Sequence, residues 1–333
     1  MGNPTPIGQR NDREMPRYGG IATFALLPRI EEVSHADVAV LGIPFDSGTS
    51  FRPGARFGPA HIRENSRQLH PYHQFLNVFP FDSQQVADAG DVAVGPYDIP
   101  RAITAIETAA RGLVEQGTRI VALGGDHTVA LPLMRAAATA HGPLAVLHFD
   151  AHLDTWDTCH GASVWHGSPF RRAAEEGIID LNHCQHVGTR GGIYDPSELA
   201  DDREAGFEII DSEEFQDQKV SDIVERIRQR LGTRPVYISV DIDVLDPAHA
   251  PATGTPEVGG LATREFFRTL RGLSGLHIVG CDVVEVAPAY DHGDITGLAA
   301  AHTAWELISL ISLSKKPVDR QGRGTVTRPT CHQ

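Results

Sequence analysis

Acidic residues and histidine are concentrated where short apolar segments of this chain end. The run Leu144-Ala-Val-Leu147 leads into Asp150-Ala-His152-Leu-Asp154, and the run Val236-Tyr-Ile-Ser-Val240 leads into Asp241-Ile-Asp243. In a β-strand, alternate side chains point to the same face. The three ionisable side chains of the first motif should therefore point together, and so should the two of the second. Groups crowded in this way after a buried strand would need a neutralising partner.

A third segment of the same kind lies upstream of both motifs. Gly124-Gly125-Asp126-His127 follows the apolar run Ile120–Leu123 and precedes a helical stretch from Thr128 to Ala140. Open α/β sheets place their ligands at the carboxyl ends of strands. As candidate ligands the three segments supply two histidines and four aspartates, namely His127, Asp150, His152, Asp154, Asp241 and Asp243.

Carboxylates mixed with imidazole suit a divalent ion of the manganese type, and this many ligands exceed the needs of one ion with open positions. The pattern therefore predicts a two-metal hydrolytic site. Each motif alone has a simpler interpretation. An isolated Asp-x-Asp is usually a solvated loop or a helix cap, and Gly-Gly before a helix is ordinary turn chemistry. The metal interpretation depends on all three motifs lying at strand ends.

Strand-like and helical segments alternate through most of the 333 residues. Strands are expected at Val38–Ile43, Arg119–Leu123, Leu144–Phe149, Cys184–Gly188, Phe207–Ile210, Val236–Val240 and His277–Val284. Helices are expected at Ile99–Gln116, Thr128–Ala140, Ser221–Leu231, Thr263–Leu273 and Thr296–Ser312. Such alternation predicts an α/β fold with a mainly parallel sheet and helices on both faces.

The three metal motifs must meet at one site although they are far apart in sequence, so we expect a single catalytic domain over residues 19–314. The two ends look different from this domain. Residues 1–18 are polar with Pro and Gly and are expected to form an N-terminal arm, and residues 315–333 lack apolar periodicity and are expected to form a disordered tail.

The overall charge excludes some classes of partner. A net charge of −14 disfavours nucleic acid or an anionic membrane, although it would suit a cationic substrate. The chain has no run of eighteen apolar residues and no signal-peptide core, so we expect a cytoplasmic protein that neither spans nor binds a membrane. The four cysteines show no paired spacing, which argues against a disulfide framework or a zinc knuckle.

The motifs resemble those of a known family. Gly124–His127, Asp150–Asp154 and Ser239–Pro247 are similar to the three signatures of the ureohydrolase family of arginase and agmatinase, and the similarity extends from about Pro16 to Leu313. The resemblance is greatest to agmatinase-type and guanidinobutyrase-type members. It implies a three-layer α/β sandwich, two Mn²⁺ ions per chain with Ni²⁺ as an alternative, and hydrolysis of a guanidinium to urea and an amine. It also implies a homo-oligomer, either a trimer or a hexamer.

The resemblance further implies a role for each metal ligand. His127 and Asp154 should bind one ion, His152 and Asp243 should bind the other, and Asp150 and Asp241 should bridge the two. Two ions roughly 3.5–4 Å apart can hold hydroxide between them and lower the pKa of water from 15.7 to about 7. This hydroxide would attack the guanidinium carbon, and Asp154 could relay the remaining proton to the leaving amine.

Two further residues match catalytic positions of the family. His166 corresponds to the histidine that shuttles protons, and Glu285 corresponds to the acid that holds the planar guanidinium, a cation that a carboxylate matches well. Without the family, His166 could be a histidine in a helix-capping loop. Glu285 could equally be a carboxylate at a strand end that pairs with an arginine.

The loop from Thr155 to Trp165 should contact the far end of the substrate. Trp156, Asp157, Ser163 and Trp165 are the candidate contacts. The loop differs from the Thr/Ser/Asn-rich version of arginases, so arginine is not the expected substrate. It also lacks the Lys or Arg that guanidino-acid hydrolases often have before the shuttle histidine. Asp157 could bind an ammonium and the two tryptophans could give cation–π contacts, although plain loop packing explains the tryptophans as well.

This reasoning favours agmatine, which would be hydrolysed to putrescine in polyamine metabolism. The alternative is a guanidinobutyrase or another hydrolase of guanidino acids or alkylguanidines, with Arg190 supplying the positive charge. Two readings from other classes stay open. One is a non-catalytic subunit of a hetero-oligomer, although such subunits usually lose ligands. The other is a deacetylase-like zinc hydrolase with one ion.

Overall fold

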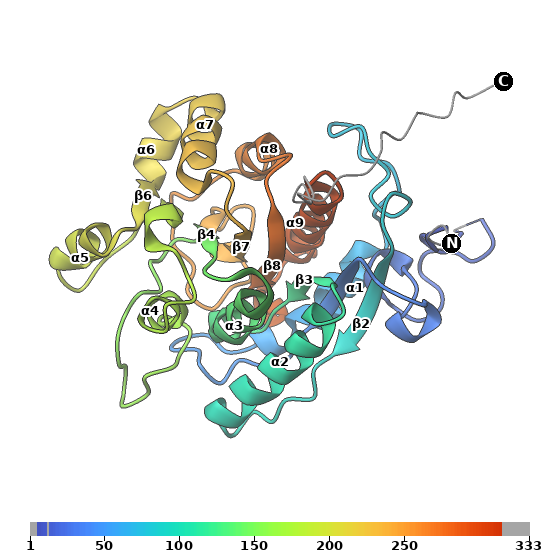
Figure 1. Ribbon diagram of the computed structural model, residues 1–333, viewed down its shortest axis with the longest axis horizontal. Coiled ribbons are helices and arrows are strands. Elements are labelled where there is room, and N and C mark those ends of the chain that lie inside the picture. The colour runs from blue at the N-terminus through green and yellow to red at the C-terminus, as the bar shows by residue number, and fades with distance from the viewer. Residues whose placement is uncertain (1–4, 12, 315–333) are drawn as a thin grey trace, which may run out of the picture.

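The computed structural model describes residues 5–11 and 13–314, and within them eight strands form one sheet (Figure 1). The strands are β1 Val38–Gly42, β2 Val86–Asp91, β3 Arg119–Leu123, β4 Ala145–Phe149, β5 Gln185–Thr189, β6 Glu208–Asp211, β7 Val236–Asp241 and β8 Ile278–Val284. Their order across the sheet is β2-β1-β3-β8-β7-β4-β5-β6, and each neighbouring pair is parallel. The predicted parallel sheet is confirmed.

Helices cover both faces of this sheet. They are α1 Gly58–Ser66, α2 Ile99–Val114, α3 Ala130–His141, α4 Pro169–Glu175, α5 Ser197–Ala205, α6 Ser212–Asp217, α7 Val220–Leu231, α8 Thr263–Gly272 and α9 Ile295–Ser312. One apolar core lies between the sheet and α1, α7, α8 and α9, and a second lies between the sheet and α2, α3 and α4 (Figure 1). The predicted three-layer sandwich is confirmed.

The central strands are buried on both faces, which explains why they read as continuous apolar runs. In β4, Leu147 and Phe149 pack into the core beneath α8 and α9, whereas Val146 packs into the core beneath α2 and α3. Because side chains alternate along a strand, His148 and then Asp150 follow Val146 toward the α2 and α3 side. The pleat of β4 thus decides on which side of the sheet the acidic cluster forms.

The edge strand β2 was missed by the sequence analysis. Its sequence, Val86-Ala-Asp-Ala-Gly-Asp91, is not an apolar run, because only one neighbouring strand covers it. Asp88 within it is buried and pairs with Arg63 of α1, whose Nε lies 2.8 Å from the carboxylate. This buried ion pair compensates an acidic residue inside a strand, which periodicity alone could not reveal.

Ile7 and Arg10, near the N-terminus, form hydrogen bonds with later residues of the folded domain. The backbone N–H of Ile7 donates to Gln85 Oε1 over 2.8 Å, and that of Arg10 donates to the Leu26 carbonyl over 3.0 Å. The boundaries given above for the arm and the catalytic domain stay predictions, and the tail predicted at residues 315–333 lies outside the described residues. No helix in the described part of the chain is long and apolar enough to cross a membrane.

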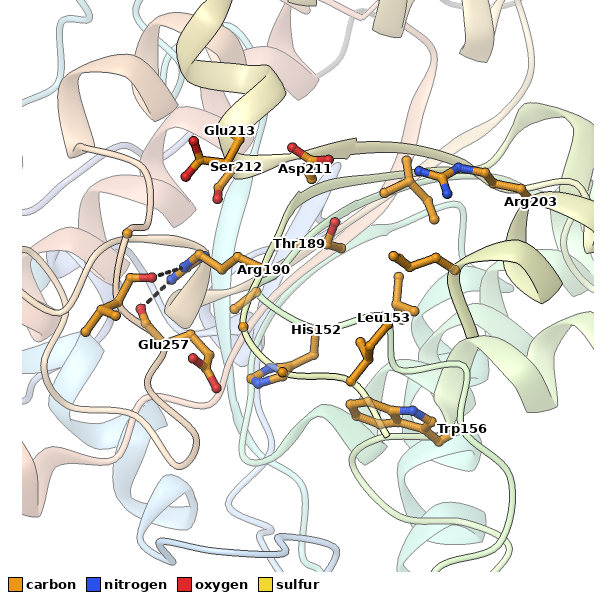
Figure 2. Close-up of a pocket in the computed structure, with 18 residues that line it drawn as sticks. His152, Leu153, Trp156, Thr189, Arg190, Arg203, Asp211, Ser212, Glu213 and Glu257 are labelled. Atoms are coloured by element: carbon orange, nitrogen blue, oxygen red, sulfur yellow. Dashed lines mark hydrogen bonds between the residues drawn. The ribbon is translucent and has the colours of Figure 1, made fainter. Parts of the chain in front are cut away.

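A pocket of about 490 Å³ opens at the carboxyl edge of the sheet (Figure 2). The segments that follow β4, β5 and β6 line it, together with residues 257–259. This is the edge at which open parallel sheets bind their ligands.

Candidate active site

Four neighbouring strands at the centre of the sheet position the predicted site residues. Across the sheet, β3, β8, β7 and β4 lead into His127, Glu285, Asp243 and Asp150, in that order. Because parallel strands end at the same edge, side chains that are far apart in sequence converge there.

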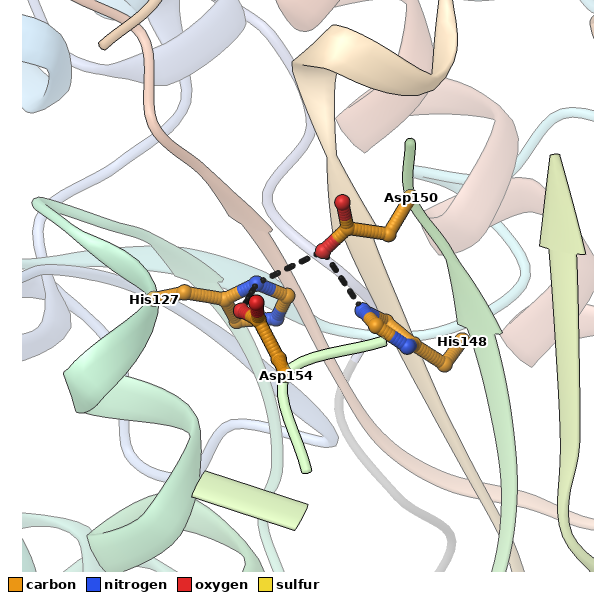
Figure 3. Close-up of side chains that lie close together, drawn as sticks. All are labelled: His127, His148, Asp150 and Asp154. Atoms are coloured by element: carbon orange, nitrogen blue, oxygen red, sulfur yellow. Dashed lines mark hydrogen bonds and ion pairs between the residues drawn. The ribbon is translucent and has the colours of Figure 1, made fainter. Parts of the chain in front are cut away.

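His127 faces three carboxylates at one end of the cluster. Its Nδ1 lies 2.9 Å from Asp154 Oδ2 and 3.1 Å from Asp150 Oδ2 (Figure 3). It also lies 3.4 Å from Asp241 Oδ2. Its Nε2 lies 2.8 Å from the hydroxyl of Ser239, which itself donates to Asp282. The Ser239 oxygen therefore accepts a hydrogen from Nε2, and the neutral ring has a bare Nδ1.

The unprotonated Nδ1 of His127 is placed to bind a cation. His127 Nδ1 is buried and has no hydrogen-bond partner, although carboxylate oxygens surround it. A lone pair facing carboxylate oxygens is repulsive unless a positive charge lies between them. The geometry therefore fits a metal ligand whose outer nitrogen is fixed by a hydrogen bond.

His152 forms the other end of the cluster. Its Nδ1 lies 3.2 Å from Asp150 Oδ1 and 3.2 Å from Asp243 Oδ2. The two oxygens of Asp150 thus face different histidines, with Oδ2 toward His127 and Oδ1 toward His152. This is the geometry that a carboxylate shared by two ions requires.

The charges of the cluster are consistent with two divalent ions. The side chains of its four aspartates are almost completely buried. Burial, together with the Asp243 and Asp150 carboxylates, raises the pKa of Asp241 well above its usual value. Two divalent cations would balance the charges of the four carboxylates, and the donor set suits such ions. The residues therefore fit a binuclear metal centre.

Two residues of the site adopt strained backbone conformations. Asp154 has φ of 53° and Glu285 has φ of 63°, in the left-handed region that favours glycine. Such a conformation costs roughly 1–2 kcal/mol for a residue with a Cβ atom. Strain of this kind is often found at functional sites.

Glu285 lies beside the cluster with one oxygen free. Its Oε1 accepts a hydrogen bond of 2.9 Å from the His127 backbone N–H and lies 3.1 Å from His166 Nδ1. Its Oε2 is buried without a partner. Among the described residues Glu285 therefore bonds to a backbone amide and a histidine, rather than to the arginine that its alternative interpretation requires.

His166 connects Glu285 to the surface. Its Nε2 lies 2.7 Å from the hydroxyl of Ser50, which is exposed. Burial opposes protonation of His166, but the carboxylates of Glu285, Asp154 and Asp126 together outweigh it and raise the pKa of His166 to about 9. The arrangement can carry a proton between the buried acid and solvent.

Several polar residues of the site were missed by the sequence analysis. Asp282 accepts hydrogen bonds from Ser239 and Tyr237 behind His127, and His148 lies 2.7 Å from Asp150 Oδ2. The signal for His148 was present, because it lies two residues before Asp150 and so shares its strand face. Asp282, in contrast, lies inside an apolar run of β8, where nothing in the pattern identifies its partners.

The substrate loop is held by contacts within itself and by contacts with α4 and α5. Trp156 and Trp165 stack with ring centroids 5.9 Å apart, and Ser163 is exposed. The Asp157 carboxylate lies 2.7 Å from Arg172 and 3.7 Å from Arg171, both in α4. The charge of Asp157 is thus already matched at the surface by two arginines.

The pocket beside His152 is lined by three carboxylates and two arginines. Glu257, Glu213 and Asp211 line it, and Trp156 forms part of its wall (Figure 2). Arg203 also lines it. Arg190 lines it too, but its guanidinium donates to backbone carbonyls, among them those of Asp243 and Glu257. The Arg190 guanidinium is therefore already used in hydrogen bonds to these backbone carbonyls.

The fold and the site together define a hydrolase of the α/β class with a binuclear metal centre. The sequence model of the arginase family matches residues 36–309. The chain is 44% identical to putative agmatinase 3 of Schizosaccharomyces pombe, over 89% of this chain and 81% of that protein. It is 40% identical to guanidinobutyrase of Pseudomonas aeruginosa, over 92% of this chain and 96% of that protein.

A solved structure agrees with these sequence matches. Proclavaminate amidinohydrolase from Streptomyces clavuligerus superimposes with a TM-score of 0.87 at 42% identity, covering 90% of this chain and 100% of that one. The chain therefore belongs to the arginase family, and the predicted resemblance is confirmed. It is a metal-dependent amidinohydrolase.

Proposed function

We propose that this protein hydrolyses agmatine to urea and putrescine with two Mn²⁺ ions. The observation behind the proposal is the placement of Glu285, whose free Oε2 is buried beside a cluster built to hold two ions. A buried carboxylate without a partner requires a cation, and a planar guanidinium satisfies both its charge and its hydrogen-bonding capacity.

Each residue of the site then has a task. His127 and Asp154 would hold one ion and His152 and Asp243 the other, and Asp150 and Asp241 would be shared between the two. When bound, the two ions supply a water whose pKa is lowered to about 7, which is the nucleophile that the reaction needs. Glu285 holds and orients the guanidinium carbon above this position, and Asp154 passes a proton to the leaving amine.

His166 exchanges protons between the site and solvent. Its Nδ1 faces Glu285, and its Nε2 faces the exposed hydroxyl of Ser50. A proton accepted in the buried site can therefore leave through Ser50 without opening the loop.

The acidic pocket favours a cationic substrate tail. Glu257 and Glu213 line the space next to His152, so an ammonium at the far end of agmatine would meet negative charge there. Asp157, which the sequence suggested for this task, is paired with Arg172. We therefore assign the ammonium to the pocket carboxylates, with Trp156 as the remaining contact from the loop.

A guanidino acid is the second candidate. Arg203 lines the same pocket and could bind a carboxylate in place of the committed Arg190. The guanidinobutyrase relative supports this alternative.

The metal, location and assembly belong to the same proposal. Oxygen-rich ligands with two histidines support Mn²⁺, with Ni²⁺ as the alternative. We propose a cytoplasmic trimer or hexamer. Metal analysis of the purified protein tests the two other classes, since a non-catalytic subunit should bind fewer ions and a deacetylase-like hydrolase should bind one zinc ion.

Urea release from a panel of guanidines tests the proposal. The Mn²⁺-loaded protein should turn over agmatine with a higher kcat/KM than 4-guanidinobutyrate, 3-guanidinopropionate or arginine. Glu257→Gln should raise KM for agmatine and change kcat less, because the contact lies far from the reacting carbon. Strong turnover of 4-guanidinobutyrate with poor turnover of agmatine would contradict the agmatine assignment and leave the hydrolytic chemistry intact.

A further inference from the structure

Two buried histidines lie next to Asp150 and outside the predicted ligand set. His148 of β4 and His186 of β5 are both fully buried, and they face each other in register on neighbouring strands. Their Nδ1 atoms are 2.7 Å apart, and His148 Nε2 lies 2.7 Å from Asp150 Oδ2 (Figure 3 shows His148 and Asp150). A continuous chain of hydrogen bonds therefore runs from His186 through His148 to Asp150.

The hydrogen positions in this chain follow from Asp150. An ionised carboxylate can only accept, so His148 Nε2 donates to Asp150 Oδ2. A neutral His148 then has a bare Nδ1, which accepts the hydrogen on His186 Nδ1. His186 keeps a bare Nε2, and this atom is indeed buried without a hydrogen-bond partner. Burial lowers the pKa of His186 well below its usual value, which keeps this ring neutral.

Aromatic rings enclose the two histidines. The Phe170 ring lies 4.1 Å from that of His148, and the Phe207 ring stacks on His186 at 4.5 Å. These apolar contacts leave each imidazole few alternative partners, of which the Asp202 carboxylate, 3.8 Å from His186 Nε2, is one. The direction of the hydrogen bonds is therefore determined by the protein and not by solvent.

A second role for His148 has to be considered, since its Nε2 is close enough to His127, Asp150 and Asp154 to join a metal site. The hydrogen bonds separate the two roles. The 2.7 Å between His148 Nε2 and Asp150 Oδ2 is a hydrogen-bond length, at which a bare nitrogen would repel the carboxylate oxygen. Around His127 Nδ1 the oxygens lie 2.9–3.4 Å away and form no hydrogen bond. A nitrogen that donates its hydrogen has no lone pair left for an ion.

We propose that His148 and His186 are positioning residues that hold Asp150 in its bridging orientation. His148 holds Oδ2, and the backbone N–H of His152 holds Oδ1 over 2.6 Å. With both oxygens held, the carboxylate cannot rotate to bind a single ion with both of them. The proposal goes beyond the proposed substrate and rests only on the two-ion assignment.

Metal titration of His148 variants tests the proposal. Metal-free protein is titrated with Mn²⁺, and the free ion is followed by its electron paramagnetic resonance signal. His148→Phe should weaken both ions by about 10–100-fold, as loss of an outer partner typically does, while two ions still bind at saturation. His148→Gln should recover part of the affinity, because its amide can donate near the Nε2 position. Loss of one ion at saturating Mn²⁺ would make His148 a ligand and overturn the proposal.

The second histidine gives an independent comparison. His186→Asn retains a donor near the Nδ1 position and should bind Mn²⁺ more tightly than His186→Leu, which retains none. His73→Phe is the matched control, because His73 is also fully buried and bonds to Glu306 over 2.8 Å. This control should lower the melting temperature without changing Mn²⁺ affinity.

The outcomes separate this inference from the metal assignment itself. If the wild type binds two ions and the His148 and His186 variants bind them with unchanged affinity, the positioning role is wrong and the two-ion site stands. Equal weakening by His73→Phe and His148→Phe would show a general stability effect and would also overturn the proposal. A wild type that binds fewer than two ions would instead refute the two-ion assignment.

Discussion

Asp150 faces both halves of the proposed metal site. Its oxygens face His127 and His152 separately, at 3.1 and 3.2 Å. Asp150→Asn should therefore abolish urea release and weaken the affinity for both ions. The loss of affinity should exceed the roughly 10–100-fold loss that follows removal of an outer hydrogen-bond partner. Urea assays and metal analysis check this, with Asp222→Asn on the exposed face of α7 as the control. Near-normal activity with full metal content would contradict the bridging role.

His166 should affect turnover and not metal binding. His166→Asn should lower kcat by about 10²–10⁴-fold, the usual contribution of a proton-transfer group, with both ions retained. Loss of metal in this variant would mean that a ligand had been mistaken for a shuttle.

The pH dependence of the wild type should report the same residue. The Glu285 carboxylate helps to raise the pKa of His166 to about 9 in the free protein, and a bound guanidinium should neutralise that carboxylate and lower this pKa. Neutral His166 is the form that accepts a proton, so activity should rise with pH. The apparent pKa should be higher in the kcat/KM profile than in the kcat profile, and the difference should disappear in His166→Asn.

Individual residues were predictable where a motif directly follows a buried strand. His127, Asp150 and Asp154 lie in one cluster, and His152 lies in a second cluster that shares Asp150, although all four residues follow their strands and do not lie within them. Asp157 shows the limit of this reasoning, since its arginine partners are in α4 and no local pattern links them.

At the scale of elements, apolar strands and amphipathic helices were predicted and polar elements were missed. α5 has almost no apolar face, so no periodicity marks it. Its function lies in polar contacts instead. Glu198 accepts a hydrogen bond of 2.8 Å from Trp156 Nε1, and Asp202 accepts one of 2.8 Å from the Thr155 hydroxyl. The helix thus fixes the first residues of the substrate loop from outside.

Asp202 makes this element sensitive to pH. Burial raises the pKa of Asp202 to about 6 from 3.8. The unfolded chain loses this proton near pH 4 and the folded protein near pH 6, so the group's stabilising effect is present below about pH 4 and is lost by about pH 6. Asp202→Asn should therefore match the wild type near pH 4 and exceed its stability by up to about 3 kcal/mol above pH 6.

Urea unfolding of the wild type and the variant at pH 4 and pH 8 measures this difference in stability. The metal-free protein is used because metal affinity itself depends on pH. The Thr155 hydroxyl can still donate to the asparagine oxygen, so the hydrogen bond serves as an internal control. A variant that is less stable than the wild type at pH 8 would show that the charge on Asp202 stabilises the fold.

At the scale of the whole molecule, the sequence predicted the layers and the meeting of the three motifs, but not the order of the strands. Alternating strands and helices imply a parallel sheet in any order. The observed order places β3, β8, β7 and β4 side by side, which long-range packing decides. Substrate choice was equally beyond the sequence, because Glu257 and Glu213 come from segments that only the fold brings to one pocket.

The net charge of the whole chain leads to a final prediction about salt. The chain has a net charge of −14, and agmatine is a dication whereas 4-guanidinobutyrate is a zwitterion. The protein's field should therefore raise the local concentration of agmatine only. Raising the salt concentration from about 0.01 M to about 0.15 M shortens the Debye length from about 30 Å to about 8 Å. Over this range kcat/KM for agmatine should fall several-fold, mainly through KM, while that for 4-guanidinobutyrate should change little. An equal fall for both substrates would mean that salt acts on the protein and not on the approach of a cation.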